Sequence, residues 1–230
     1  MVLEIIVWVD CCFIIMQLDI KEQSLILEGK KYSRKELMSL SANATGDNTS
    51  SFLLDLYRFL ADWFSDSPFM TVHTSGSTGT PKVLTVRKEQ MMQSARMTCE
   101  FLNLHTGDTA LLCMPLQYIA GKMMVVRALV AGLNLILRTP SGHPLADVTV
   151  PLRFVAMVPL QVFNTLQVLR EKERLCHTDI LIIGGGAIDA ALENEIRLLP
   201  GEIYSTYGMT ETLSHIALRR LNGSSASPYY

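Results

Sequence analysis

The segment His73–Lys82 combines hydroxyl side chains, glycines and a lysine within ten residues. Glycines let backbone N–H groups approach an anion, hydroxyls donate further hydrogen bonds, and a lysine supplies a compact positive charge. It differs from a Walker A loop, because only two residues separate Gly76 from Gly79 and Lys82 follows a proline. The segment therefore predicts a polyphosphate-binding loop, and a Ser/Gly-rich surface turn is the alternative. The candidate binding residues are Thr74, Ser75, Gly76, Ser77, Thr78, Gly79 and Lys82.

A second segment, Tyr204–Thr212, follows the short apolar stretch at Ile203 and contains Tyr207, Gly208, Thr210 and Glu211. A glutamate offers the hard oxygen ligand that Mg²⁺ prefers beside phosphate oxygens. A tyrosine ring provides an apolar face for stacking. Taken alone, a Thr-Glu pair is more often a helix-capping element.

A third segment, Ile183–Ile188, contains the run Gly184, Gly185, Gly186 and Ala187. Such glycines allow a ligand to approach the backbone closely. The segment is no dinucleotide fingerprint, because Asp189 stands where a third spaced glycine is required. The alternative is a simple turn from a strand to a helix.

Taken together and in their order along the chain, the three segments resemble signatures of the adenylate-forming enzymes, which include acyl-CoA synthetases, luciferases and peptide-synthetase adenylation domains. Residues 74–82 resemble the family's Thr-Ser-Gly-Ser/Thr-Thr-Gly-x-Pro-Lys signature, with Val83 in place of a glycine that often follows. Residues 207–211 resemble its Tyr-Gly-x-Thr-Glu segment, and residues 184–187 its Gly-Gly-Ala segment. The resemblance covers residues 69–215.

This resemblance implies binding of ATP and Mg²⁺, with coenzyme A as co-substrate. The reaction it implies joins a carboxylate to the α-phosphate of ATP and expels pyrophosphate, so the site must neutralise charge and align the reactants. Lys82, Thr210 and Glu211 take the catalytic roles, Thr210 at the α-phosphate and Glu211 as the Mg²⁺ ligand. Tyr207, with Gly208, takes the role of the residue that stacks on adenine.

Residues 113–121 resemble the family segment that shapes the acyl pocket, with Tyr118 where histidine is common and Gly121 at its end. Lys122 and Arg127 then follow in an otherwise apolar helix. A cation there could pair with the second carboxylate of a dicarboxylate substrate, or the two side chains could snorkel from a partly exposed face. Along with Met157–Val162, these residues most resemble o-succinylbenzoate–CoA ligases of menaquinone biosynthesis. Other aryl or fatty acyl ligases, and a non-catalytic nucleotide-binding module, remain alternatives.

The composition fits a folded intracellular protein. The 230 residues are 49% hydrophobic and 18% charged, with a formal net charge of −2, which argues against a nucleic-acid-binding surface. Five cysteines without C-x-x-C spacing indicate a reduced, cytoplasmic setting. The apolar residues 1–15 are too short to span a membrane and predict a buried strand or an upstream artefact of the start site. Small-molecule carboxylates are the expected partners, and homo-oligomerisation stays open.

Hydrophobic periodicity predicts an α/β fold whose mostly parallel sheet is flanked by helices. Residues 1–68 are expected to form a small hairpin/helix region on a core of residues 69–230. A hairpin is expected over 23–35 and a loop over 41–51. The resemblance also implies a C-terminal lid domain; nothing after His215 matches it, so we expect weak nucleotide binding and poor catalysis from this chain alone. Helices are expected over 34–40, 52–64, 88–102, 120–131, 159–173 and 189–198, and strands over 69–72, 83–86, 109–114, 133–137, 154–158 and 179–183.

Overall fold

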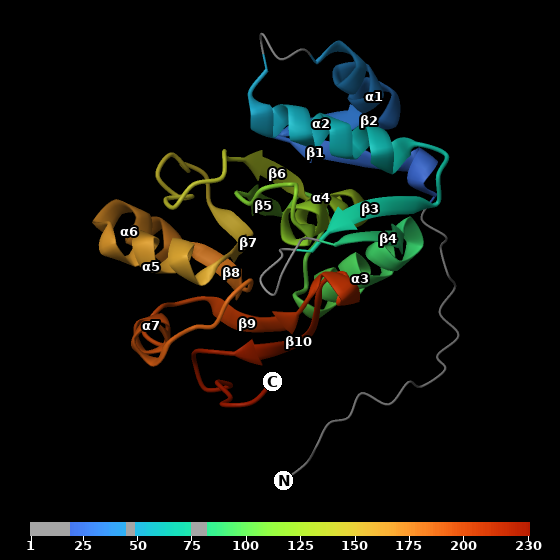
Figure 1. Cartoon of the computed structure of the whole chain (residues 1–230). Helices are drawn as coiled ribbons and strands as arrows, with labels where there is room; N and C mark the ends of the chain where they lie inside the picture. Colours follow the sequence, from blue (N-terminus) through green and yellow to red (C-terminus); the bar gives the residue numbers. More distant parts are fainter. Residues whose placement is uncertain (1–18, 45–48, 75–81) are drawn as a thin grey trace.

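The structure, a computed structural model, describes residues 19–44, 49–74 and 82–230. A sheet of eight strands forms its centre, in the order β10-β9-β8-β7-β5-β6-β1-β2, and helices cover it (Figure 1). The predicted fold class, a mostly parallel sheet flanked by helices, is confirmed.

Four of the five strands in the parallel part of the sheet are continuous apolar segments. Their inner residues are almost all buried, as expected for strands that are covered on both faces, whereas the fifth strand, Glu202–Gly208, buries only Ile203 and Ser205. The carboxyl ends of these strands share one edge of the sheet, where ligands bind in open α/β folds. The strands are β5 (Thr109–Leu112), β6 (Asn134–Leu137), β7 (Leu152–Met157), β8 (Thr178–Ile183) and β9 (Glu202–Gly208).

Helices occupy the crossovers between these strands: α4 (Ile119–Ala131) joins β5 to β6, and α7 (Ala190–Ile196) joins β8 to β9. The chain moves from β5 to β6 in one direction along the sheet and from β7 to β9 in the other. Since parallel crossovers are right-handed, α4 lies on the face opposite α7 and the helices between β7 and β8. Figure 1 shows α5, α6 and α7 together on one side.

The predicted single helix over 159–173 is wrong, because the structure has two: α5 (Pro159–Gln167) and α6 (Leu169–Cys176). Val168 between them is extended, with φ −113° and ψ 112°. The buried positions explain the break. Leu166 and Glu171 are both buried but lie five residues apart, so an uninterrupted helix would place them on different sides of its axis. A break in the backbone returns α6 to the core.

The amino-terminal part extends the same sheet. The expected hairpin forms from β1 (Ser24–Leu27) and β2 (Lys30–Ser33), and β1 pairs with β6 in parallel. Its two-residue turn places Glu28 and Gly29 at φ 48° and 80°, as a type I′ turn requires.

Two helices follow this hairpin. Ser33 caps α1 (Arg34–Asn43) through a capping box with Glu36, and the helix runs three residues beyond the predicted end. The amphipathic helix α2 (Ser51–Phe64) buries Trp63, whose Nε1 donates to Gln23 Oε1 at 2.8 Å. The expected loop over 41–51 therefore begins after Asn43, and residues 45–48 lie outside the described residues.

A separate two-stranded sheet carries the first sequence motif. Strands β3 (Phe69–His73) and β4 (Val83–Arg87) pair antiparallel, with His73 opposite Val83. Helix α3 (Lys88–Phe101) follows directly and packs against α4. The hairpin thus stands beside the main sheet (Figure 1).

One strand was not predicted: β10 (His215–Arg220) runs antiparallel to β9 at the edge of the main sheet. Strand β9 also begins before the Tyr204–Gly208 motif and includes it, so that motif is a strand end rather than a loop. Among the described helices, none is long and apolar enough to cross a membrane.

Candidate functional site

The glycine-rich segment and the Tyr-Gly segment lie side by side at the carboxyl edge of the sheet. Strands β8 and β9 are parallel, with Ile183 opposite Ser205, so Gly184 and Gly185 continue beside Thr206 and Tyr207. The N–H of Gly184 donates to Met157 O at 3.0 Å, which ties this segment to β7. Gly186 and Ala187 then lead to Asp189, whose carboxylate caps α7 by accepting from Leu192 N at 2.8 Å.

Gly208 permits the tight return from β9 to β10. A Cβ atom at this position would lie 2.3 Å from Ser214 O and 2.5 Å from the Cα of His215, so any larger residue would separate the two strands. Tyr207, immediately before it, keeps 53% of its surface exposed. The ring of Tyr207 is therefore available to a ligand at the strand end.

The turn Thr210–Thr212 holds two polar side chains ready for a ligand. Thr212 Oγ1 accepts from Met209 N at 3.0 Å and donates to Ser214 O at 2.7 Å, so it closes the turn. The side chains of Thr210 and Glu211 have no hydrogen bond or ion pair within residues 19–44, 49–74 and 82–230. Sequence reasoning missed Thr212, although a side chain that bonds back three residues is a recognisable turn signal.

The base of the β3–β4 hairpin is closed by the two ends of the first motif. Thr74 N donates to Lys82 O at 3.0 Å, and Lys82 N donates to Thr74 Oγ1 at 2.9 Å. Ser75, Gly76, Ser77, Thr78 and Gly79 lie outside the described residues. A surface hollow joins the hairpin to the Thr210–Thr212 turn; its lining residues are Leu84, Thr85, Val86, Gln90, Glu211, Thr212 and Leu213. The structure thus brings the flank of the first motif against the second.

Helix α4 begins at this same edge, after β5. Tyr118 precedes its first residue and remains 42% exposed. Gly121 lies against the backbone of Pro115, where a Cβ atom would come within 2.4 Å of the carbonyl oxygen. The glycine therefore allows the loop after β5 to press onto the helix, a packing role that the sequence did not indicate.

The two cations of α4 face different surroundings. They are five residues apart, which places them about 140° apart around the helix axis. The Nζ of Lys122 lies 5.5 Å from the ring centroid of Phe59 on α2. Arg127 instead contacts Ser214, just beyond the Thr210–Thr212 turn. The structure does not bring these two predicted substrate-binding residues together.

Arg127 is only 3% exposed and belongs to a chain of hydrogen bonds. Its Nη2 donates to Ser214 Oγ at 2.7 Å, and Ser214 Oγ lies 3.4 Å from His215 Nδ1. His215 Nε2 is 3.3 Å from Thr98 Oγ1, which donates to Ser94 O at 3.0 Å. Since Ser214 accepts from the arginine, it can donate to Nδ1, so a neutral His215 protonated at Nε2 satisfies the whole chain.

Burial shapes the charges of this cluster. It lowers the pKa of Arg127 to about 10, which still leaves the guanidinium protonated at neutral pH. Burial, followed by the charge of Arg127, lowers the pKa of His215 to about 4 and keeps the imidazole neutral. No carboxylate pairs with Arg127, and its Nε has no partner, in the part of the chain that the structure describes. Sequence reasoning missed both Ser214 and His215.

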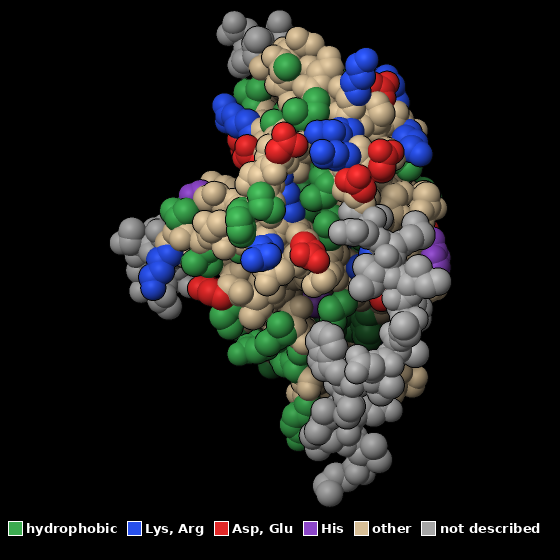
Figure 2. Space-filling model, turned by 90° about the vertical axis from the view of Figure 1, so that its right-hand side faces the viewer, with side chains coloured by type: hydrophobic (Ala, Val, Ile, Leu, Met, Phe, Trp, Pro, Cys, Tyr) green, Lys and Arg blue, Asp and Glu red, His purple; other side chains and the backbone are tan. Residues whose placement is uncertain are grey.

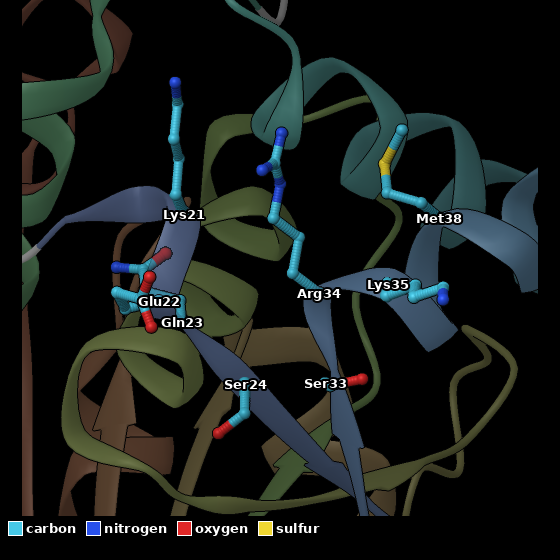
Figure 3. A pocket seen from close by; sticks show the side chains of 8 residues that line it. All are labelled: Lys21, Glu22, Gln23, Ser24, Ser33, Arg34, Lys35 and Met38. Atoms are coloured by element: carbon cyan, nitrogen blue, oxygen red, sulfur yellow. The ribbon is translucent and has the colours of Figure 1, made fainter.

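A second hollow lies at the opposite end of the sheet (Figure 3). Its lining residues are Lys21, Glu22, Gln23, Ser24, Ser33, Arg34, Lys35 and Met38. In this view Lys21 and Lys35 point in different directions, and Arg34 donates to Phe64 O at 3.0 Å. None of the predicted site residues lines it, so it is a separate feature from the carboxyl edge.

Acidic and basic side chains are intermixed on the face shown in Figure 2, which has no continuous basic strip. The described residues also contain no cluster of three or more His, Cys, Asp or Glu that could hold a metal ion by themselves. A cation at Glu211 would therefore need oxygen ligands from a substrate, as Mg²⁺ bound beside phosphates does.

A family profile described as "AMP-binding enzyme" matches residues 9–229. The chain belongs to this family. The curated relatives that match include 2-succinylbenzoate–CoA ligase of Haemophilus influenzae, which is 29% identical over 168 residues that cover 73% of this chain and 36% of that protein. The corresponding ligase of Enterococcus faecalis is 31% identical, over 63% of this chain and 30% of its own length.

Solved structures match this chain as well. An acyl-CoA synthetase (AMP-forming)/AMP-acid ligase II-like protein from Dyadobacter fermentans is 36% identical, with a TM-score of 0.74 over 83% of this chain and 54% of that one. The o-succinylbenzoate coenzyme A synthetase of Bacillus subtilis, solved in complex with ATP and magnesium, shares the fold with a TM-score of 0.63 at 17% identity. The chain spans about a third to a half of the length of its matched relatives in curated collections and of the Dyadobacter protein.

Proposed function

We propose that the site at the carboxyl edge serves the ATP-dependent activation of a carboxylic acid, with o-succinylbenzoate as the acid. In this reaction an oxygen of the carboxylate attacks the α-phosphorus of ATP, the bond to the β-phosphate oxygen breaks, and pyrophosphate leaves. The acyl-adenylate then reacts with the thiol of coenzyme A, which releases AMP and forms the thioester. The sequence similarity to named 2-succinylbenzoate–CoA ligases supports this choice.

Each part of the proposed site follows from its surroundings. Tyr207 and the adjoining Gly184–Gly186 segment would hold the adenine, since an exposed ring and an open backbone lie together at the strand ends. The hydroxyl of Thr210, which has no partner among the described residues, would donate to the α-phosphate. Lys82 and residues 74–79 would bind the outer phosphates, in line with their hydroxyl and glycine content.

Glu211 fits the role of the Mg²⁺ ligand. Its carboxylate has no partner in the described part of the chain and lines the hollow between the hairpin and the turn. When bound, Mg²⁺ would neutralise charge on the phosphates, which two reacting anions require. The protein itself contributes one carboxylate, a typical number for Mg²⁺ that is also held by phosphates.

The observation that carries the choice of acid is the buried Arg127, which pairs with no carboxylate in the part of the chain that the structure describes. Buried charges in proteins are normally paired, and in the described residues the hydroxyl of Ser214 is the only oxygen that meets this guanidinium. A carboxylate is the natural counter-ion. o-Succinylbenzoate carries two carboxylates, so one can react with ATP while Arg127 binds the other.

The test is the relative rate of pyrophosphate release by the purified protein with ATP, Mg²⁺ and a panel of acids, since we expect the absolute rate of this chain alone to be low. We expect release with o-succinylbenzoate to exceed release with benzoate, with a fatty acid, and with 3-benzoylpropionate, which lacks the ring carboxylate. Equal rates with o-succinylbenzoate and 3-benzoylpropionate would remove the dicarboxylate assignment. A shift in thermal unfolding on addition of a non-hydrolysable o-succinylbenzoyl-adenylate analogue provides a readout that needs no turnover.

A further inference from the structure

The last four residues of the chain return to the strand that carries the proposed adenine-stacking ring. After β10, the chain doubles back, and Ser227 N donates to Arg220 O at 3.0 Å (Figure 1). Tyr230 then reaches β9: its hydroxyl lies 2.5 Å from Ser205 Oγ. Ser205 itself is buried, so this bond fixes the end of the tail to the body of the sheet.

Tyr230 also contacts Tyr207. The centroids of the two rings are 5.7 Å apart with an interplanar angle of 53°, within the range of favourable aromatic pairs. Ser205 and Tyr207 are two residues apart on a strand and therefore point to the same face. Tyr230 thus anchors to one residue of β9 and packs against the next residue on that face.

Tyr230 also lies beside a salt bridge. The guanidinium carbon of Arg219 lies 5.6 Å from the centroid of the Tyr230 ring. Arg219 is held by Glu193 on α7 through two bonds, of 2.8 and 3.1 Å. Both side chains of this pair are largely buried, which makes the support rigid.

We propose that Tyr230 is a positioning residue that holds the ring of Tyr207 in the orientation for stacking on adenine. This inference rests on the proposed function, because it assigns a role toward the same nucleotide. A tyrosine at a strand end has several rotamers, and a ligand that selects one of them loses affinity through the entropy of ordering it. Tyr230 contacts Tyr207, and 53% of Tyr207 stays exposed for the base.

The test compares binding of AMP and of inorganic pyrophosphate to the purified chain by calorimetry. Pyrophosphate has no base, so the loss of a residue that orients the base-binding ring should weaken the binding of AMP and leave the binding of pyrophosphate unchanged. Tyr230→Ala should weaken AMP binding about two- to twelvefold, the range that an aromatic pair of ~0.5–1.5 kcal/mol gives. Tyr230→Phe, which keeps the ring and loses the bond to Ser205, should restore most of the affinity.

Tyr229→Ala is the matched control, because Tyr229 is 78% exposed and only its backbone joins the tail. It should leave both ligands unchanged. Unaltered AMP binding by Tyr230→Ala, or equal weakening of both ligands, would overturn the proposal. Tighter AMP binding would overturn it as well, by showing that Tyr230 takes the place of the base.

Tyr207→Ala separates this inference from the function on which it rests. If wild-type protein binds AMP and Tyr207→Ala weakens that binding, the adenine site stands and the Tyr230 variants decide the positioning role. If wild-type protein does not bind AMP, or if Tyr207→Ala binds it normally, the adenine site is wrong and the role of Tyr230 falls with it.

Discussion

Lys122 and Arg127 lie on one apolar helix, yet their surroundings differ in kind. Lys122 reaches α2, where Phe59 lies under its ammonium group, and burial lowers its pKa while Asp62 and Asp55 act in the opposite direction. Arg127 is nearly inaccessible and faces the turn that ends in Ser214. The difference is that carboxylates of the protein itself lie near Lys122 and partly offset its burial, whereas no carboxylate in the described residues pairs with Arg127, for which we therefore propose an anionic ligand.

Arg127→Met should have the largest effect. Removing a charge-assisted hydrogen bond of ~1.5–3 kcal/mol should weaken binding of an o-succinylbenzoyl-adenylate analogue about 10- to 100-fold. Arg127→Lys should recover part of the loss, since lysine keeps the charge but not the planar fork. Calorimetry provides the affinities.

An analogue without the ring carboxylate is the control for Arg127. Wild type and Arg127→Met should bind it with similar affinity. Equal losses for both analogues would mean that Arg127 only maintains the fold, and the contrast with Lys122 would lose its functional meaning.

His215, in the same hydrogen-bonded cluster as Arg127, should make the stability of the folded protein depend on pH. Its pKa is about 4 in the folded protein and 6.5 in the unfolded chain, so below pH 6.5 the unfolded chain binds a proton that the folded protein does not. Stability should therefore fall as the pH drops from about 6.5 to 4. At pH 4.5 the loss from this one group should be about 2–3 kcal/mol.

Urea unfolding at pH 7 and pH 4.5 measures this loss, with His215→Gln as the reference that cannot titrate. The wild type should lose more stability than the variant between the two pH values. Identical losses would show that His215 is not buried as a neutral ring beside Arg127.

Glu211→Gln tests the free carboxylate at the turn. We expect about tenfold weaker binding of ATP in the presence of Mg²⁺, ~1.4 kcal/mol, and no change when EDTA removes the metal. Glu195→Gln, an exposed change on α7, should leave binding unaltered. A Glu211→Gln protein with normal Mg²⁺ dependence would contradict the assignment.

Lys122→Met should have the smallest effect. Methionine keeps most of the apolar stem against Phe59, so we expect a change in unfolding free energy below ~1 kcal/mol and ligand affinities within about twofold of wild type. A large loss of affinity for the dicarboxylate analogue alone would contradict this expectation and would indicate that Lys122 binds the acyl group of the substrate.

The sequence was sufficient for the parallel part of the fold because continuous apolar segments such as Leu152–Met157 have few alternatives to a buried strand. It was insufficient at Val168, where the helix breaks because the buried side changes direction, a tertiary effect with no local signal. Strand β10 also escaped prediction, because its side chains are stabilised by partners distant in the sequence, such as Glu193 for Arg219.

For the candidate site, the motif residues could be placed at strand ends from the sequence, and the pairing of β8 with β9 puts two of the segments together. Which cation of α4 faces the site could not be predicted, since Lys122 and Arg127 have equally apolar neighbours in the sequence. Ser214 and His215 gain their significance only from contact with α4 and α3.

The most direct measurement is a crystal structure of the protein with a non-hydrolysable o-succinylbenzoyl-adenylate analogue. We predict adenine against Tyr207 beside the Gly184–Gly186 segment, with the ring carboxylate within hydrogen-bonding distance of Arg127. An analogue bound elsewhere, such as in the hollow near Lys21, or one whose second carboxylate points away from Arg127, would contradict the account.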